Sequence, residues 1–307
     1  MIRLDDLALF VRSAALGGFS GAAREADLLP GQVSAAIQRL ERHLDVRLFA
    51  RSTRSLRLTA EGERYLPFAQ EALLALRDGR ERLHGTPGEL RGTLLVATPS
   101  DLGRNVLLPW LAEFRRAHPA LHLRVSCSDQ VADVFRDPVD VAIRYSPGAD
   151  ANYIALPLAP ANRRVLVASP AYLDRAGSPA TLDDLVRHDC LLWTLGNRVH
   201  DKWSFHDGAQ RRVVRVRGPL DSDDGEIARK LALAGEGIAY KSWLDVRADV
   251  QAGRLVRLLP QVQGEAAPLH LVCPHRKQFS PAVQALHGWL RARCDALGEA
   301  PPAVPAP

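Results

Sequence analysis

Four arginines lie within eleven residues of this 307-residue chain, and no acidic residue interrupts them. They are Arg47, Arg51, Arg54 and Arg57. The guanidinium group is always charged and can donate paired hydrogen bonds to phosphate oxygens. This spacing therefore predicts contact with the backbone of a nucleic acid.

A second set of polar side chains occupies one face of a helix that is predicted to begin at Pro30. Its apolar stripe falls within about 60° around the helix and consists of Val33, Ile37, Leu40 and Leu44. The remaining surface carries small and hydrogen-bonding residues: Gly31, Gln32, Ser34, Ala35, Ala36, Gln38, Arg39 and Arg42. Small residues let a helix approach base edges in the DNA major groove, where amides and hydroxyls can bond to bases or phosphates.

The elements that position these groups follow from periodicity. A first helix is indicated by apolar residues in i, i+3, i+4, i+7 spacing: Leu7, Phe10, Val11 and Ala14. Ser20 is the expected N-cap of a second, short helix. Residues 56–58 alternate apolar and basic, so the arginines should lie on a short β-hairpin with Ser52 and Thr53 at its tip. Together these elements predict a helix-turn-helix with an arginine-tipped hairpin, or wing; a plain three-helix core with a solvated polar face is the alternative.

A long helix should follow, with Thr59 as its N-cap. Leucine and alanine recur in it at three- and four-residue spacing, and Pro67 should bend it. We interpret it as a dimerising linker, the alternative being a helix that packs on its own domain. It ends near a Gly/Pro cluster at residues 84–88, which is the expected domain boundary.

Strand and helix patterns alternate from Arg91 onward, which predicts an α/β unit with a mostly parallel sheet. Expected strands include 93–97, 121–126, 139–144, 165–168, 213–216, 255–258 and 269–272, and expected helices include 131–135, 227–234 and 281–293. The Pro/Ala-rich tail at 298–307 has too few packing groups to fold and is expected to be disordered.

The bulk composition excludes several classes of protein. Length predicts two domains, and 47% hydrophobic residues suffice for a core. No apolar run is long enough for a membrane-spanning helix, and acids interrupt the N-terminal apolar segment, so we expect a mature cytoplasmic protein with no membrane partner. The four cysteines form no CxxC pair, the histidines form no HExxH motif, and no nucleotide-binding glycine signature or coherent catalytic set is present. We therefore expect no metal, no cofactor and no enzyme activity. The net charge of +5 permits nucleic-acid binding without arguing for it.

The chain as a whole resembles the LysR-type transcriptional regulators. Residues at the family's signature places include Phe19-Ser20, Ala22-Ala23, Val33-Ser34, Leu40-Glu41, Leu44, Arg47-Leu48-Phe49, Arg51, Leu58-Thr59 and Gly62. The segments GTLLVATPSDLGR, VDVAIRY, RRVLVASPAYL and DSDDGEIARKLALAGEGIAYKSWLDVRADVQAGRL resemble the family's effector domain in the same order. The resemblance covers nearly the whole chain and is most specific in the N-terminal part.

The resemblance implies an α/β protein overall with an N-terminal winged helix-turn-helix at 1–58 and a linker helix and hinge at 59–88. The effector-binding domain at 91–297 would be periplasmic-binding-protein-like, with two α/β subdomains. Subdomain I would comprise 91–161 and 268–297, and subdomain II would comprise 162–267. The implied partners are double-stranded promoter DNA, a small-molecule effector of unknown identity, RNA polymerase, and further copies in a homodimer or homotetramer.

The recognition helix departs from the family pattern at Leu29-Pro30-Gly31 and at Ala35-Ala36, where many members carry polar or basic residues. DNA contacts are therefore expected from Ser20, Gln32, Ser34, Gln38, Arg39, Arg51, Ser52, Thr53 and Arg54.

Ligands of open α/β sheets bind at the carboxyl ends of strands, where helix N-termini point outward. This rule and the resemblance predict effector contacts from Thr98, Pro99, Ser100, Ser128, Arg144, Trp193, Ser222 and Asp223. Ser100 and Asp223 could instead cap helices, Arg144 could form a structural ion pair, and Trp193 could belong to the core.

The leading hypothesis is thus a sequence-specific DNA-binding transcriptional regulator that responds to a small molecule. A small-molecule-binding protein whose N-terminal domain only oligomerises is the alternative, although it leaves the arginine-rich hairpin unexplained. An α/β enzyme is a third hypothesis.

Overall fold

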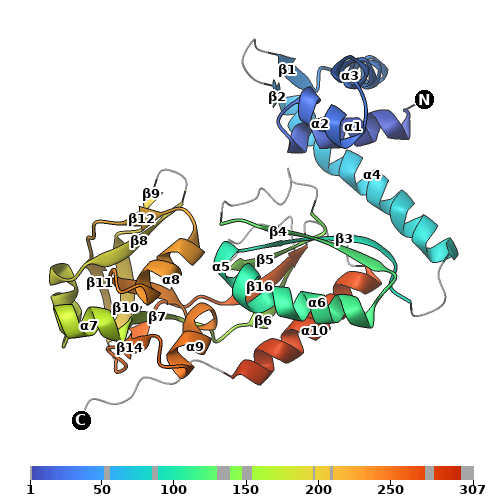
Figure 1. The fold of residues 1–307 in the computed structure, drawn as a ribbon. Helices are drawn as coiled ribbons and strands as arrows, with labels where there is room; N and C mark the ends of the chain where they lie inside the picture. Colours follow the sequence, from blue (N-terminus) through green and yellow to red (C-terminus); the bar gives the residue numbers. More distant parts are fainter. Residues whose placement is uncertain are drawn as a thin grey trace.

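The computed structural model describes residues 2–51, 56–84, 89–129, 139–146, 154–195, 198–207, 210–273 and 280–298. Figure 1 shows an N-terminal unit at one end of a long helix, α4, and two α/β units that follow α4 in the chain and lie to the left of it in this view. Besides the Gly/Pro boundary, of which residues 85–88 are not described, three sets of predictions lie outside the described residues. These are the hairpin tip with Ser52, Thr53 and Arg54, the helix at 131–135, and the tail from residue 299.

The N-terminal unit is a winged helix-turn-helix, as predicted. It consists of α1 (Leu4–Ala15), α2 (Phe19–Glu25), α3 (Pro30–Leu44), β1 (Phe49–Arg51) and β2 (Leu56–Leu58), and the two strands pair antiparallel. Phe10, Ile37, Leu40 and Leu48 are almost fully buried in one cluster between the helices and the hairpin. The apolar stripes therefore point inward as their spacing indicated.

Two sequence-based predictions in this unit are wrong. Gly18, and not Ser20, is the N-cap of α2, and no side chain caps that helix end. Ala36, which was expected to lie on the outer face of α3, is only 1% exposed. Both α1 and α2 pack on α3, so more than one stripe of α3 is covered.

Glu41 of α3 is a buried charged residue that connects the recognition helix to the wing. Its Oε1 accepts hydrogen bonds from the backbone N–H groups of Leu48 at 2.8 Å and Phe49 at 3.2 Å. Its Oε2 lies 3.1 Å from Nη1 of Arg47. The carboxylate thus satisfies two buried donors at the start of β1 and fixes the wing against α3.

Helix α4 (Ala60–His84) continues without interruption through Pro67. The hydroxyl of Thr59 accepts a hydrogen bond from the N–H of Gly62 at 3.0 Å, as predicted for its N-cap. Leu66 and Ala69 are buried in the core of the N-terminal unit, so the first half of α4 packs on its own unit. Phe68 and Leu76 are exposed. No helix in the described part of the chain is both long enough and apolar enough to span a membrane.

Subdomain I is built on a five-stranded sheet with the order β4-β3-β5-β16-β6. Its elements are β3 (Gly92–Thr98), α5 (Ser100–Leu102), the π-helical turn η1 (Gly103–Leu107), α6 (Leu108–Ala117), β4 (Leu121–Cys127), β5 (Val141–Tyr145), β6 (Ile154–Ala159), β16 (Leu269–Cys273) and α10 (Pro281–Leu297). Side chains of α6 and α10 pack together against the sheet, and Nε1 of Trp289 donates to the carbonyl of Trp110 at 3.0 Å.

Subdomain II contains a sheet with the order β12-β8-β13-β7-β14 and a smaller antiparallel sheet with the order β11-β10-β15. Its strands are β7 (Arg164–Ala168), β8 (Cys190–Leu195), β9 (Arg198–Val199), β10 (Lys202–Asp207), β11 (Gln210–Arg215), β12 (Asp221–Ser222), β13 (Ile238–Ser242), β14 (Val256–Leu258) and β15 (Gln263–Gly264). Its helices are α7 (Pro170–Ala176), the 3₁₀ helix η2 (Leu182–Arg187), α8 (Gly225–Leu233) and α9 (Trp243–Gln251).

Each main sheet is mostly parallel, as predicted, because four of its five strands run in the same direction and one strand is reversed. In the sheet of subdomain I, β3 pairs parallel with β4 and β5, whereas β16 pairs antiparallel with β5 and β6. In the main sheet of subdomain II, β8 pairs parallel with β12 and β13, whereas β7 pairs antiparallel with β13 and β14. The antiparallel strands β7 and β16 are the first strands after each passage between subdomains, so the return of the chain reverses their direction.

The two passages between subdomains lie side by side. The chain leaves subdomain I after β6 and returns before β16. The N–H of Ala267 donates to the carbonyl of Asn162 at 2.9 Å, and Nδ2 of Asn162 donates to the carbonyl of Ala267 at 2.6 Å. Nδ2 of Asn162 also lies 2.9 Å from Oγ of Ser242. Asn162 therefore ties the two crossovers to each other and to the end of β13.

Replacing Glu41 with alanine should destabilise the N-terminal unit by about 2–4 kcal/mol, because two buried N–H groups lose a charged acceptor. Amide hydrogen exchange at residues 48–49 would measure the loss locally. Glu61→Ala, which removes a solvent-screened ion pair with Arg64, is the control and should change stability by no more than about 1 kcal/mol. Equal exchange rates in the two variants would show that the Glu41 carboxylate does not hold the wing.

Candidate functional site

The outer face of α3 presents the side chains that were predicted to contact DNA. Gln32, Ala35 and Gln38 are exposed, and Ser34 is half-buried. Ser20 is exposed in the first turn of α2. These α3 residues are thus accessible in the same unit that carries the wing strands β1 and β2 (Figure 1).

Gln32 has a structural role in addition to its exposure. Its Oε1 accepts a hydrogen bond from the backbone N–H of Leu29 at 2.8 Å, at the start of α3. This bond caps the helix and fixes the amide group of Gln32 beside the helix N-terminus.

Arg39 is held by α1. Its Nη2 lies 2.7 Å from Oδ1 of Asp6 and its Nε lies 3.1 Å from Oδ2, so the pair is bidentate. The hydrogen bond to Asp6 raises the pKa of Arg39 above its ordinary value. The side chain remains 41% exposed, so it can contact phosphate while its orientation is fixed.

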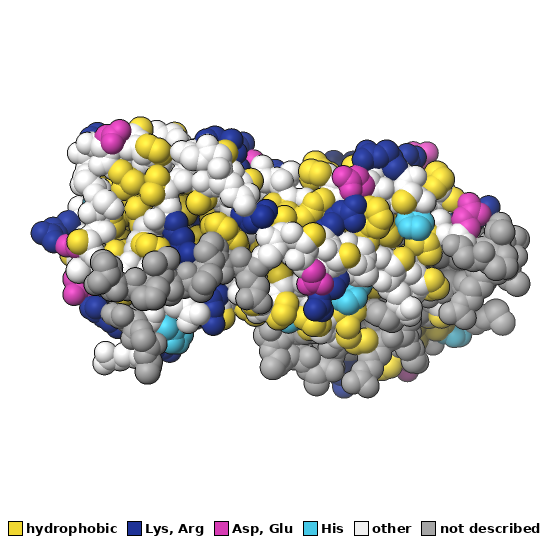
Figure 2. Space-filling view, turned by 90° about the horizontal axis from the view of Figure 1, so that it is seen from below, with side chains coloured by type: hydrophobic (Ala, Val, Ile, Leu, Met, Phe, Trp, Pro, Cys, Tyr) yellow, Lys and Arg dark blue, Asp and Glu magenta, His cyan; other side chains and the backbone are white. Residues whose placement is uncertain are grey.

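The wing offers Arg57, which is exposed on β2, and Arg47, which is exposed while paired with Glu41. Arg51 ends β1. On the opposite side of the molecule, Figure 2 shows basic side chains scattered among apolar and neutral ones on the described surface. Among the described residues, the wing thus exposes Arg47 and Arg57, and α3 exposes Gln32 and Gln38.

The second candidate site lies where the carboxyl ends of strands from both subdomains meet. Ser100 follows β3 and Ser128 follows β4, which are neighbours in the sheet of subdomain I. Ser222 and Trp193 are register partners on β12 and β8 of subdomain II. Ser100, Ser128, Trp193 and Ser222 therefore lie at the carboxyl ends of strands in the two subdomains, and Ser100 contacts Asp224 across the boundary between them.

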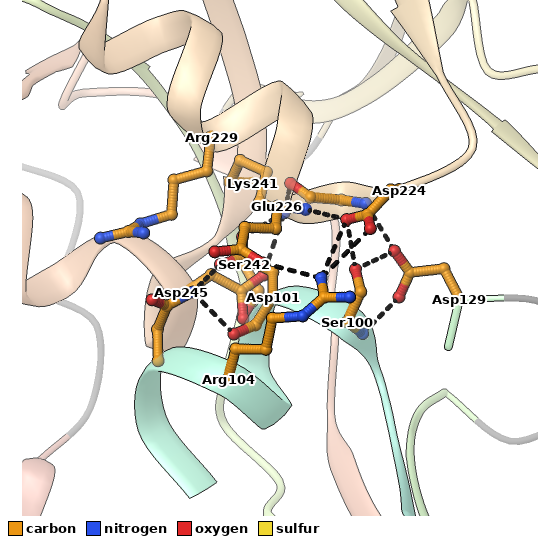
Figure 3. A network of polar contacts seen from close by, with 12 residues as sticks. Ser100, Asp101, Arg104, Asp129, Asp224, Glu226, Arg229, Lys241, Ser242 and Asp245 are labelled. Carbon is orange, nitrogen blue, oxygen red and sulfur yellow. Dashed lines mark hydrogen bonds and ion pairs between the residues drawn. The ribbon is translucent and has the colours of Figure 1, made fainter. Parts of the chain in front are cut away.

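Ser100 is almost completely buried and bonds across the subdomain boundary. Its hydroxyl lies between the carboxylates of Asp129 and Asp224, at 2.8 Å from Oδ1 of Asp224 (Figure 3). Asp224 also caps α8 by accepting from the N–H of Glu226 at 2.8 Å. Burial alone would raise the pKa of Asp224, but hydrogen bonds from Ser100, Glu226 and Arg104 outweigh it and lower the pKa.

Asp223, which was expected at the start of α8, is exposed, and the neighbouring Asp224 is the N-cap. The hydroxyl of Ser222 accepts from the N–H of Asp224 at 3.1 Å. These contacts shape the loop before α8.

Thr98 and Arg144 have partners within subdomain I. The Thr98 hydroxyl is fully buried and donates to Sγ of Cys127 at 3.3 Å. Arg144 is half-buried and donates to the carbonyl of Ile143 at 3.1 Å. Pro99 is half-buried as the N-cap of α5. Trp193 is also half-buried, and its ring lies 4.7 Å from that of His200.

A buried lysine forms the centre of the contact between subdomains. Nζ of Lys241 lies 2.6 Å from Oδ2 of Asp101 in subdomain I and 3.5 Å from Oδ2 of Asp245 in subdomain II. The hydroxyl of Tyr145 donates to Oδ1 of Asp245 at 2.6 Å. Arg104 adds ion pairs to Asp224 and Glu226 at 3.1 and 2.7 Å. Figure 3 shows these charged groups converging from α5, α8, β13 and α9.

The protonation of this cluster follows from burial and charge. Burial raises the pKa of Asp101 to about 6, even though Lys241 opposes the shift. Burial alone would lower the pKa of Lys241, but the two carboxylates outweigh it and keep the pKa above its ordinary value.

The sequence-based prediction missed Asp101, Arg104, Asp129, Lys241 and Asp245 as members of this contact. One feature of the sequence pointed to Lys241, because this lysine directly follows the apolar run Ile238–Tyr240 in a chain whose basic residues are mostly arginine. A lysine at such a position needs a buried acidic partner.

Comparison with known proteins identifies the family of both parts of the chain. Residues 4–63 match the bacterial regulatory helix-turn-helix family of lysR type, and residues 87–295 match the LysR substrate binding domain. The chain belongs to the LysR family of transcriptional regulators. Its members are DNA-binding regulators with an effector-binding domain, so the leading hypothesis from the sequence is confirmed at the level of the family.

Individual LysR relatives match most of the chain. The transcriptional regulator DmlR of Escherichia coli is 34% identical over 258 residues, which is 84% of each chain. The transcriptional repressor PA14_22550 of Pseudomonas aeruginosa is 32% identical and covers 94% of this chain and 92% of its own length. The solved structure of CrgA, a LysR-type regulator from Neisseria meningitidis, is 28% identical, covers 96% of this chain and 99% of its own, and has a TM-score of 0.60.

The raised pKa of Asp101 predicts a pH dependence of stability. The ordinary value is 3.8 and the folded value is about 6, so the folded state holds the proton more tightly. The free energy of unfolding should fall as the pH rises between these values, by up to about 3 kcal/mol, and then level off. Asp101→Asn should lack this fall, whereas the exposed control Asp174→Asn should retain it. Urea unfolding across the acidic range would test this, and parallel curves for wild type and Asp101→Asn would contradict it.

Proposed function

We propose that this LysR regulator binds operator DNA through α3 and the wing. The observation that carries this proposal is the exposed face of α3, with Gln32, Ala35 and Gln38, beside the arginine-bearing hairpin. The residues proposed to contact bases are Gln32, Ser34 and Gln38. Those proposed for the DNA backbone are Ser20, Arg39, Arg51, Ser52, Thr53 and Arg54, together with Arg57.

We propose further that two copies associate through α4. Phe68 is 68% exposed and Leu76 is 51% exposed. They lie eight residues apart, so they face the same side of the helix. Burying such side chains against a second copy would remove apolar surface from water, and two helix-turn-helix units could then bind two half-sites. A homotetramer would pair two such dimers.

The cleft between the α/β subdomains is the proposed effector site, with Ser100, Ser128, Trp193 and Ser222 at its edges and Thr98, Pro99, Arg144 and Asp223 around them. An effector can change DNA binding only if it binds two arrangements of the protein with different affinities. Opening and closing of the two subdomains provides such arrangements. Because the proposed partner is promoter DNA, we place the protein in the cytoplasm, where RNA polymerase is a further proposed partner. A mobility-shift assay with the DNA upstream of its own gene tests the proposal, and a competent dimer that shifts no such fragment would refute it.

Gln38→Ala should reduce the preference for the operator over sequences altered at the contacted base by about 1–3 kcal/mol. Binding to unrelated DNA should hardly change, because the side chain carries no charge. Competition mobility-shift assays measure both quantities. The exposed Gln284→Ala on α10 serves as control, and an unchanged preference in Gln38→Ala would remove α3 from base recognition.

Arg57→Ala should weaken binding to all DNA sequences alike and reduce the slope of log K against log salt concentration by about 0.9, the value for one lost phosphate contact. A salt titration of fluorescence anisotropy measures this slope. Arg116→Ala, an exposed change on α6, should leave the slope as it is. A normal slope in Arg57→Ala would mean that β2 does not face the DNA.

A further inference from the structure

The carboxylate of Asp129 spans the boundary between the two subdomains. Asp129 follows β4 in subdomain I, and its Oδ1 accepts from the backbone N–H of Ser100 at 2.8 Å. Its Oδ2 accepts from the backbone N–H of Gly225, the first residue of α8 in subdomain II, and from the hydroxyl of Ser100. One carboxylate therefore receives one backbone N–H from each subdomain (Figure 3).

The position that this carboxylate occupies is closely fitted. A Cβ on Gly225 would lie 3.1 Å from Oδ2 of Asp129 and 3.0 Å from Nζ of Lys241. Lys241 donates to the carbonyl of Gly225 at 2.9 Å and so holds this peptide in place. Glycine is thus the residue that lets the chain approach the carboxylate this closely, and the buried ammonium fixes the approach.

A second carboxylate, that of Asp224, lies close to Asp129 and has donors of its own. The single proton of the Ser100 hydroxyl can serve Asp129 or Asp224, but not both at once. Asp224 has its own donors in Arg104 and the N–H of Glu226. The two N–H groups of Ser100 and Gly225 therefore remain the principal donors to Asp129.

We propose that Asp129 is a tethered carboxylate ligand of the effector cleft, which closes the two subdomains when no effector is bound. An effector that acts at this position must then carry a carboxylate and displace the Asp129 side chain from Ser100 and Gly225. This inference rests on the proposed function of the cleft as an effector site.

Tethering has a quantitative consequence. A side chain that is already part of the protein competes at a high effective concentration, so a free carboxylate binds weakly to the wild type. Removal of the side chain leaves two N–H groups that a small free carboxylate can occupy. Formate is the appropriate probe because it is the carboxylate group with nothing attached except hydrogen.

The test uses the full-length chain without DNA, in sodium formate or in sodium chloride of equal ionic strength. Asp129→Ala in chloride should lower Tm by about 4–8 °C, the scale expected when charge-assisted hydrogen bonds are lost from a domain of this size. It should also speed amide hydrogen exchange in peptides that contain Ser100 and Gly225. Formate should restore both readouts in Asp129→Ala and leave the wild type and the exposed control Asp174→Ala unchanged.

Asp129→Asn keeps the size of the side chain and covers the case in which Asp129→Ala does not fold. Asp129→Asn should have a lower Tm than the wild type. Formate should not raise this Tm, because the amide side chain still fills the position. Unchanged Tm and exchange in Asp129→Ala, or a formate effect equal to that of chloride, would overturn the proposal. Stabilisation of the wild type by formate to the same extent would also overturn it. These readouts do not involve DNA, so they stand apart from a failure of operator binding.

Discussion

The buried ammonium of Lys241 is the charge on which the arrangement of the effector domain depends. A charge removed from water is costly unless acidic partners surround it, and those partners come from both subdomains. Asp101 belongs to the helical stretch that begins after β3, and Asp245 belongs to α9. Asp245 lies in the same subdomain as Lys241, whereas the closer carboxylate of Asp101 comes from the other subdomain, so the shorter ion pair forms only when the two subdomains are in contact. This contact also brings Ser100 and Asp129 to the start of α8.

A similar arrangement operates in the DNA-binding unit, where buried acids connect elements that must present one surface. Glu41 joins α3 to the wing, and Asp6 of α1 orients Arg39 of α3. In both places the carboxylate is nearly inaccessible while the basic partner remains partly exposed. The buried carboxylates of Asp6 and Glu41 therefore fix the positions of the partly exposed side chains of Arg39 and Arg47.

Much of the fold could be predicted from the sequence because apolar spacing determines which face of a helix is buried. The helices beginning at Leu4 and Pro30, the wing strands and the cap at Thr59 follow from local patterns. Ala36 could not be placed, because alanine is small enough for either face and its burial depends on how α1 and α2 both pack on α3. The direction of β7 and β16 depends on the path of the whole chain.

The contents of the cleft were harder to predict for a physical reason. Ser100 and Asp224 are 124 residues apart in the chain, and Asp129 and Gly225 are 96 apart. Neither pair leaves a local pattern. Strand ends indicated Ser100 and Ser222, because the carboxyl edge of a sheet follows from topology. Which carboxylates contact the other subdomain depends on how the two sheets are placed relative to each other.

The bonds between Asn162 and Ala267 determine how the two sheets can move relative to each other. Two independent linkers would allow the subdomains to twist, slide and separate. Crossovers that are hydrogen-bonded to each other oppose separation and sliding, so rotation about the crossovers is the relative motion that keeps both bonds. A change in the contacts of Ser100 would then rotate one subdomain relative to the other. Atoms far from the crossovers would move further than atoms close to them.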